Sequence, residues 1–165
     1  MPATPIAAEE RYFERGVTKV YFLTAITAPT KIPTRTELNA GKDITEAIAD
    51  IDGWKIEGDD IETPDLGSRF KKTIPGELSA DDSSLTCYRD AMGLDIRTLL
   101  PRGTKGYVVW LDAGDVEDGP MDIFPVRVKS LGKSRTVDTD AANIEVTFSI
   151  LDEPVEDASV PATTP

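Results

Sequence analysis

The sequence lacks histidine entirely and has a single cysteine among its 165 residues. Without histidine, the chain has no access to the commonest general base, to the usual partner of a catalytic serine or cysteine, or to the usual nitrogen ligand of zinc. With only Cys87, it can form neither an intrachain disulfide nor a cysteine metal cluster. Cys87 stands between Thr86 and Tyr88 in a strand-like run, so we interpret it as a small core residue.

Long apolar runs and positive charge are scarce as well. No apolar stretch approaches the roughly 20 residues of a membrane span. The first residues also lack the basic and then apolar pattern of a secretory signal. We therefore expect a soluble protein without a membrane partner that matures in a reducing compartment. Thirty acidic against 18 basic residues give a formal charge of −12, and an acidic surface repels the phosphates of DNA.

The sequence instead offers short apolar segments separated by turn residues. Strand-like runs occupy residues 18–25, 43–58, 83–89, 106–111, 121–131 and 143–151. Asp52-Gly53 predicts a turn or bulge inside the second run, and Pro125 predicts an edge or a bulge in the fifth. Only the last run alternates cleanly between apolar and polar residues, which is typical of a half-buried strand.

Helical signals are few. Residues 94–100 have the strongest helical pattern, whereas residues 29–41 are typical of a loop with at most one helical turn at 35–40. A helical turn within residues 45–51 stays open as an alternative to a strand. The sequence thus predicts a mainly β fold: an antiparallel β-sandwich or partly open barrel with one short flanking helix. Residues 1–16 are expected to form an N-terminal arm, residues 17–152 the β-domain, and residues 153–165 a flexible C-terminal tail.

Residues 57–82 form the most informative segment, because they join two strand-like runs and yet far exceed the usual 2–5 residues of a hairpin loop. Acidic residues crowd both shoulders, and a basic and apolar centre runs from Arg69 to Gly76. A loop of this length is functional or disordered. Its charge pattern indicates a surface that meets a complementary copy of itself, which favours assembly over catalysis.

The remaining motifs are weak. Gly132-Lys133-Ser134 resembles the end of a phosphate-binding loop, but Arg127 occupies the position where that motif needs a glycine. The acidic turn at residues 112–122 does not have EF-hand spacing and is better explained as a solvated hairpin. Trp54, Tyr107 and Trp110 lie in or beside apolar runs, which favours core packing over a stacking platform for bases or sugars. We therefore predict no catalytic, cofactor-binding or metal-binding residue.

Two groups of polar residues are candidates for surfaces between subunits. The basic residues of the fifth run and its continuation are interpreted as a face for neighbouring subunits: Arg127, Lys129, Lys133 and Arg135. The polar positions of the last run, Glu145, Thr147 and Ser149, share one strand face. The sequence does not decide whether that face would line a lumen or the outside.

Several segments resemble, in their order and extent, the major tail tube proteins of siphophages that infect actinobacteria. They are IEGDDIETPDLGSRF at residues 56–70, IPG at 74–76, SADDSSLT at 79–86, RTLLPRGTKGYVV at 97–109, FPVRVKSLGKSR at 124–135 and NIEVTFSILDEP at 143–154. No single segment is a chemical signature. The resemblance spans residues 10–154, most of the chain.

The resemblance implies a β-sandwich with one helix, six subunits to a ring, and rings stacked into a hollow tube through which viral DNA passes without specific binding. It implies further partners: a tape-measure protein, tail-tip proteins and a tail terminator. It also implies a place in the virion tail, after assembly in the cytoplasm of the bacterial host. Long loops and arms bridge successive rings in such proteins.

Residues at the centre of the long segment are therefore expected to contact the adjacent ring: Arg69, Phe70, Lys71, Lys72 and Ile74. The alternative is a β-sandwich domain that decorates or binds a virion without polymerising. A third class, a carbohydrate-active or metal-dependent hydrolase, has only scattered carboxylates in its favour.

Overall fold

The computed structural model describes residues 1–7 and 10–163. Residues 8, 9, 164 and 165, which belong to the predicted arm and tail, lie outside the described residues. The strands are β1 (Lys19–Leu23), β2 (Lys42–Asp43), β3 (Ile48–Asp52), β4 (Glu57–Glu62), β5 (Thr73–Ser79), β6 (Ser83–Tyr88), β7 (Lys105–Leu111), β8 (Pro120–Ser134), β9 (Asn143–Ile150) and β10 (Val155–Ser159). The helices are α1 (Arg35–Ala40), α2 (Ile96–Leu99) and the 3-10 turn η1 (Thr45–Ala47).

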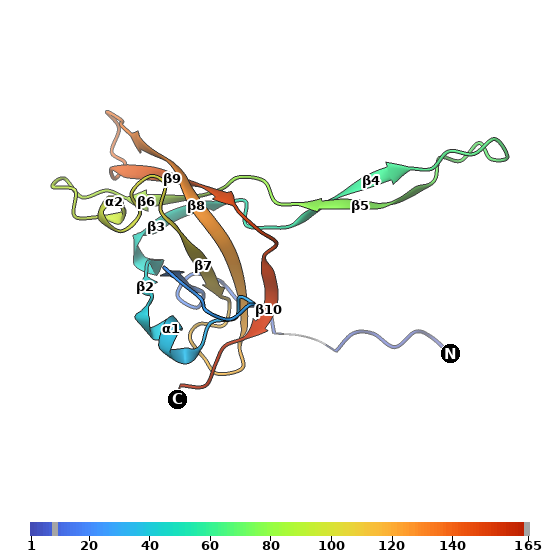
Figure 1. Ribbon diagram of the computed structural model, residues 1–165, viewed down its shortest axis with the longest axis horizontal. Helices are drawn as coiled ribbons and strands as arrows, with labels where there is room; N and C mark the ends of the chain where they lie inside the picture. Colours follow the sequence, from blue (N-terminus) through green and yellow to red (C-terminus); the bar gives the residue numbers. More distant parts are fainter. Residues whose placement is uncertain (8–9, 164–165) are drawn as a thin grey trace.

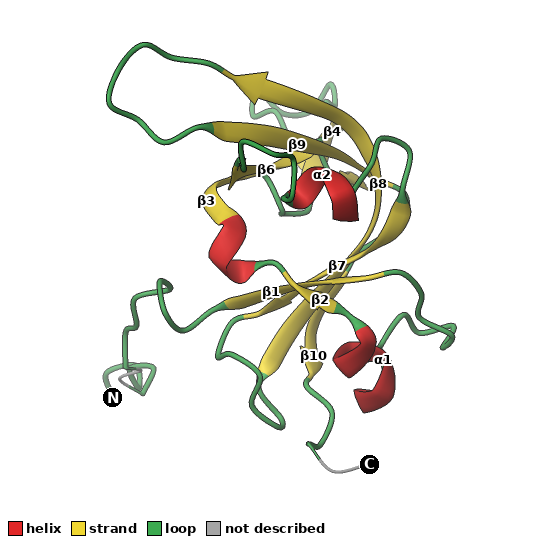
Figure 2. Cartoon of the chain, turned by 90° about the vertical axis from the view of Figure 1, so that its left-hand side faces the viewer, coloured by secondary structure: helices red, strands yellow, loops and turns green. Residues whose placement is uncertain are grey.

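Eight strands form one antiparallel sheet in the order β2-β1-β7-β8-β9-β6-β3, with β10 also paired to β8. The 15-residue β8 links two layers, because its first half pairs with β7 and β10 and its second half pairs with β9. Figure 2 shows β8 passing from one layer into the other. The sheet does not close, since its order ends at β2 and β3. The predicted mainly β fold with a partly open barrel is confirmed.

Two apolar clusters stabilise this arrangement. The larger one fills the space inside the curved sheet and includes Phe22, Trp110, Phe124 and Phe148. The smaller one lies on the opposite face of β1, β7 and β8, beneath Leu38 of α1 and the C-terminal segment. The β1–β7–β8 layer is therefore covered on both faces, whereas the β9–β6–β3 layer has only one buried face.

Pro125 does not lie at an edge, so that prediction is wrong in part. It pairs with Tyr107 of β7, and its carbonyl accepts a hydrogen bond from the Leu151 amide at 2.9 Å on the other side. On that second side β8 changes partner, from β10 up to Ile123 to β9 from Val126 onward. The missing N–H of proline falls in this gap, where no ladder bond is lost.

Two α-helices instead of one are present among the described residues: α2 lies within the predicted 94–100, and α1 occupies residues 35–40, where the sequence predicts at most one helical turn in a loop. Thr34 begins α1 with a capping box in which the Glu37 carboxylate accepts from the Thr34 amide at 2.8 Å. The predicted helix at 94–100 contracts to the four residues of α2, and the helical turn considered for 45–51 is the three-residue η1 before β3. None of the helices described is long and apolar enough to cross a membrane.

The C-terminal segment is not the expected flexible tail over its described length. β10 pairs with β8, and Ala158 and Val160 are buried in the smaller cluster. Arg35 of α1 then holds the chain that follows by donating to the carbonyls of Pro161 and Ala162 at 2.7 and 2.9 Å. Two apolar residues and one guanidinium fix this segment, a pattern too sparse to be detected in the sequence.

Candidate assembly surfaces

The segment predicted as a long loop is a β-hairpin, which corrects that prediction. β4 and β5 pair with each other in a separate two-stranded sheet, and residues 63–72 form its tip. We call residues 57–79 the projecting hairpin and the rest of the fold, from Thr18 to Val160, the body. Figure 1 shows the hairpin extending from one end of the body along the longest axis of the molecule. The sequence does not predict the pairing of β4 with β5, because neither face of this two-stranded sheet is buried and apolar residues therefore do not alternate with polar ones along it.

The projecting hairpin is exposed along almost its whole length. Every residue of β4 is exposed, and Gly76 is the one half-buried residue of β5. Apolar side chains nonetheless occur along it: Ile61 lies directly opposite Ile74, and Phe70 at the tip is 75% exposed. A two-stranded hairpin of this kind is marginally stable in isolation. Its apolar side chains are available for contact with another molecule.

The root of the hairpin is anchored in the core by Trp54. Gly53 and Trp54 both have positive φ, 82° and 63°, so the chain turns sharply between β3 and β4. The Trp54 ring packs 5.3–5.4 Å from the rings of Trp110, Phe124 and Phe148. Its indole N–H donates to the Ser84 carbonyl at 3.0 Å. The predicted turn at Asp52-Gly53 and the core role of Trp54 are confirmed, and this turn fixes where the hairpin leaves the body.

Charges at the hairpin tip are partly paired within the same chain. Lys71 forms an ion pair with Glu62, and Lys72 forms one with Asp65 at 2.9 Å. Arg69 makes no ion pair within the residues that the structure describes. The acidic shoulders thus neutralise two of the three basic residues locally. Arg69 is the basic residue of the tip that these intrachain ion pairs leave unneutralised.

A second exposed surface is the outer face of the β3–β6–β9–β8 layer. Glu145 lies between Thr86 and Gly132, Thr147 lies between Ser84 and Ser130, and Ser149 lies opposite Arg127. Residues directly opposite each other in an antiparallel pair share a face. The predicted Glu145, Thr147 and Ser149 therefore join hydroxyl residues of β6 and β8, which sequence reasoning missed because pairing across strands is not visible in one strand. We call this surface the polar sheet face; Asp50 and Asp52 of β3 extend it.

The four basic residues predicted to form a stripe are not brought together on one face. Arg127 lies on the polar sheet face opposite Ser149, and Lys129 sits in a bulge and forms an ion pair with Asp82. Lys133 lies opposite the buried Ile144, on the other face, and Arg135 follows the end of β8. They therefore line one strand without forming a single positive surface.

Chemically reactive arrangements are not a feature of the described residues. Cys87 is fully buried, which raises the pKa of its thiol to about 11 and confirms its place in the core. No group of three or more potential metal ligands occurs in the part of the chain that the structure describes. Arg97 donates to Asp95 and holds the pKa of that carboxyl well below its usual range, and the Asp95 side chain caps α2. These groups serve the fold.

Among the described residues, the fold is a curved antiparallel sheet with free edges at β2, β3 and β10, one exposed polar face and a projecting hairpin. The chain belongs to the phage tail tube protein family, whose model matches residues 6–163. It is therefore a structural component of a virion tail. A search of curated protein sequences finds no match.

Solved structures carry the same fold at low sequence identity. A chain from the sheath/tube terminator of an extracellular contractile injection system, in its extended state, matches with a TM-score of 0.63 at 16% identity, over 92% of this chain and all of that one. The tail tube of SPP1 matches with a TM-score of 0.55 at 17% identity, over 89% of this chain and 79% of that one. The tail of an empty GTA particle, obtained by helical refinement with C6 symmetry, matches with a TM-score of 0.51 at 10% identity, over 90% of this chain and all of that one.

Proposed function

We propose that this chain assembles into rings, six subunits to a ring, and that the rings stack into the hollow tail tube that conducts viral DNA into the host. The observation that carries the proposal is the projecting hairpin. It leaves the body along the longest axis, has no core of its own and presents apolar side chains to solvent. A segment of this kind gains stability by packing against another subunit.

Ring closure would come from the free edges of the sheet. Within the described chain, β3 pairs with β6 alone and β2 pairs with β1 alone. Unpaired edges invite pairing with another chain, and closure of a ring removes them. The GTA tail refined with C6 symmetry is consistent with six subunits in this ring. Because the contact from ring to ring repeats without closing, the product is a filament.

The polar sheet face would line the lumen. It presents carboxylates at Asp50, Asp52 and Glu145 among serine and threonine hydroxyls. Among the described residues that pair across this face, Arg127 is the single cation. A surface of net negative charge repels a polyanion, so DNA would slide along it without specific binding. Of the two alternatives that the sequence leaves open for Glu145, Thr147 and Ser149, we propose the lumen.

Contacts between subunits are assigned on the same basis. Arg69, Phe70, Lys71, Lys72 and Ile74 of the projecting hairpin contact the next ring, with Phe70 and Ile74 as apolar anchors. Arg127, Lys129, Lys133 and Arg135 contribute charges along β8 to contacts with neighbouring subunits. Residues 1–16 act as an arm that bridges successive rings. The tape-measure, tail-tip and terminator proteins complete the tail.

The setting follows from the sequence resemblance. The virus is a siphophage of an actinobacterium, and its tail assembles in the cytoplasm of that host. The family and the fold are compatible with this setting, and the host itself is open to a direct test by infection.

Negative-stain electron microscopy of the purified protein at rising concentration tests the proposal. Hollow tubes with a regular axial repeat are the expected result, and a cross-section at higher resolution would identify the face that lines the lumen. A protein that stays monomeric at every concentration, and still forms no tubes when other tail components are added, would instead be a decoration domain that binds a virion without polymerising. A variant in which a short turn replaces the projecting hairpin is the matched control.

A further inference from the structure

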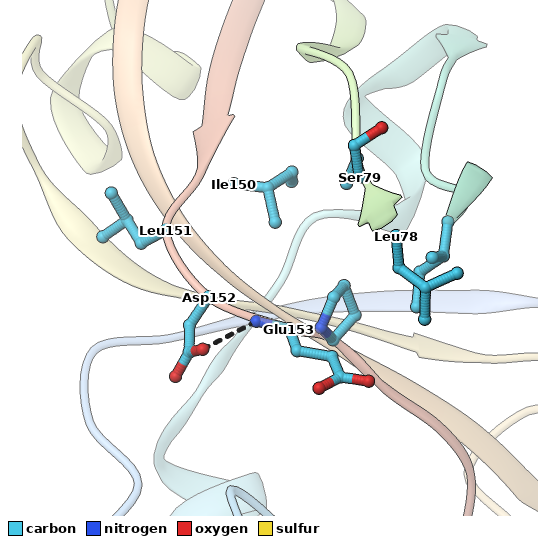
Figure 3. A pocket seen from close by; sticks show the side chains of 9 residues that line it. Leu78, Ser79, Ile150, Leu151, Asp152 and Glu153 are labelled. Atoms are coloured by element: carbon cyan, nitrogen blue, oxygen red, sulfur yellow. Dashed lines mark hydrogen bonds between the residues drawn. The ribbon is translucent and has the colours of Figure 1, made fainter. Parts of the chain in front are cut away.

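A pocket of about 260 Å³, lined by apolar and polar side chains, lies at the root of the projecting hairpin. Its apolar lining comes from Ile56, Leu78 and Ala80 beside the hairpin and from Ile150, Leu151 and Pro154 at the junction of β9 and β10. Figure 3 shows Leu78 on one side of the hollow and Ile150 on the other. Leu78 is 65% and Leu151 is 50% exposed, so the pocket presents apolar surface that nothing in the body covers.

Two carboxylates stand at one side of the pocket. Asp152 is held by Lys31 at 2.8 Å and by the Glu153 amide at 2.8 Å. The Glu153 carboxylate makes no ion pair within the described residues, and its backbone carbonyl accepts from Lys31 at 2.9 Å. Lys31 thus positions the chain between β9 and β10, while the Glu153 carboxylate is free to pair with a cation of another molecule.

The tip of the hairpin is the chemical complement of this pocket. Phe70 is an exposed aromatic side chain, and its amide is fixed by the Ser68 hydroxyl at 3.0 Å. Arg69 is next to it and has no ion pair in the described chain. An aromatic side chain seated in a desolvated pocket, with a charged pair at the rim, is the usual composition of a strong contact between proteins.

Geometry decides between this pocket and a second one. The second pocket, of about 470 Å³, is lined by residues including Tyr88 and Leu94 near α2, at the end of the body opposite the hairpin. From Glu57 to Leu66 the hairpin spans ten residues, or roughly 30 Å at about 3.3 Å per residue. A tip docked at the far end would hold successive bodies apart by that length and leave a gap in the tube wall. A tip docked at the root lets each hairpin run alongside the next body.

We propose that Phe70 of one copy inserts into the root pocket of a copy in the next ring, with Arg69 against Glu153. This inference rests on the proposed tube and adds the surface that receives the hairpin. Each subunit then carries both halves of the contact, Phe70 at the tip of its hairpin and the pocket where the root of the hairpin meets the β9–β10 junction. The axial rise between rings is therefore set by the length of the hairpin, roughly 30 Å when the hairpin lies along the axis and less when it is tilted.

A photochemical cross-link maps the contact directly. The variant Phe70→p-benzoylphenylalanine keeps an aromatic ring at the tip, and a mixture of isotopically light and heavy copies distinguishes links between chains from links within one chain. After irradiation of assembled tubes, we expect cross-linked peptides that contain residues 78–80 or 150–154 of a different copy. Products confined to residues 88–99, or the lack of any product between copies in intact tubes, would overturn the inference. The same label at the exposed Val137 is the control and should not reach the root pocket.

A charge exchange tests the rim. Arg69→Glu and Glu153→Arg should each raise the concentration needed for tube formation by roughly fivefold, and the double variant should restore most of the loss. The double variant Arg69→Glu with Glu117→Arg has the same net charge but alters an exposed carboxylate on the β7–β8 turn, so it should not restore assembly. Equal behaviour of the two double variants would contradict the proposed pair.

The experiments distinguish a failure of the proposed tail tube from a failure of the root pocket as the receiving surface. If the unsubstituted protein forms no tubes under any condition, the proposed function is wrong and this inference falls with it. If tubes form but the label maps elsewhere and the charge exchange restores nothing, the tube stands and only the root pocket is wrong as the receiving surface.

Discussion

In the body, side chains from distant strands meet in two apolar clusters, whereas in the projecting hairpin almost every side chain faces water. The two regions are continuous, since β3 leads into β4 and β5 leads into β6 through short connections. The body holds its shape by burial, and the hairpin holds its shape by a ladder of backbone hydrogen bonds and two local ion pairs. A substitution should therefore affect folding in one region and assembly in the other.

The connection between the regions explains how one chain can separate the two tasks. Trp54 belongs to the core through its contacts with three aromatic rings, yet it directly precedes the hairpin. Because Trp54 packs against these rings and donates to the Ser84 carbonyl, it restricts the directions in which the hairpin can leave the body. This restriction lowers the entropy lost when the tip binds another subunit.

The largest expected effect is on the body. Phe124 is 1% exposed and contacts Trp54 edge to face, so Phe124→Ala should lower the free energy of unfolding by about 3–5 kcal/mol. Urea denaturation followed by tryptophan fluorescence measures the change. Leu66→Ala at the fully exposed tip is the matched control and should leave the urea midpoint nearly unchanged. An equal loss of unfolding free energy in both variants would mean that the body and the projecting hairpin do not differ in their contribution to folding.

A somewhat smaller effect is expected where the C-terminal segment joins the body. Arg35 is 6% exposed and contacts Asp115 through both terminal nitrogens at 2.9 Å. Arg35→Met would leave that carboxylate and two carbonyls without their donor, at a cost of about 2–3 kcal/mol, since Asp115 is only partly buried. Chemical denaturation measures the loss, and limited proteolysis should cut after β10 more rapidly.

The double variant Arg35→Met with Asp115→Leu provides the control for this contact. Replacing both partners by apolar groups removes the unpaired charge and should recover part of the loss. Unchanged proteolysis of the C-terminal segment in Arg35→Met would mean that β10 alone holds it, without help from α1.

The third prediction concerns the hairpin and separates assembly from folding. Phe70→Ala should leave the free energy of unfolding of the monomer within about 0.5 kcal/mol, because the side chain makes no core contact. The same change should raise the concentration needed for tube formation by roughly thirtyfold, which corresponds to about 2 kcal/mol at each contact. Sedimentation and electron microscopy measure assembly. Tubes of normal length at the parent concentration would remove Phe70 from the contact between rings.

A strand could be predicted from the sequence where one of its faces is buried and the other is exposed. β9 was predicted almost to the residue because one face is core and the other is solvent, so Ile144, Val146, Phe148 and Ile150 alternate with polar residues. β4 and β5 bury neither face, and β10 contributes the buried Ala158 and the partly buried Val155, so none of these strands produces that pattern. Local turn chemistry was readable at Gly53, where φ is positive.

The candidate surfaces were readable only where they are local. Phe70 and Arg69 lie within one local segment, so the sequence could single them out, and the structure shows Phe70 exposed at the hairpin tip. The root pocket combines Ile56 and Leu78 with Ile150 and Leu151, residues separated by more than seventy positions in the chain, and no local pattern connects them. The polar sheet face likewise depends on the register of β6, β9 and β8. Surfaces made by pairing across strands require the fold.

The smallest expected effect is at the margin of the body, in the cap of α1. The Glu37 carboxylate accepts from the amides of Thr34 and Thr27 at 2.8 and 2.9 Å, and these bonds lower its pKa from 4.5 to about 2. A carboxyl whose pKa is lower in the folded state adds stability above its unfolded pKa and loses it as the pH falls. The contribution should therefore be complete above about pH 4.5 and should vanish as the pH falls through about 2.

The amide resonances of Thr27 and Thr34 provide the measurement, because each amide reports the charge of the carboxylate that it contacts. In an NMR titration they should shift together with a midpoint near pH 2, below the ordinary range of a glutamate. Glu37→Gln keeps an acceptor but removes the charge, so its amides should show no such midpoint. A midpoint near 4.5 in the unsubstituted protein would mean that the cap is not formed in solution. In that case the burial of Leu38 in the smaller cluster, and not the hydrogen bonds to the Glu37 carboxylate, would hold α1 against the body.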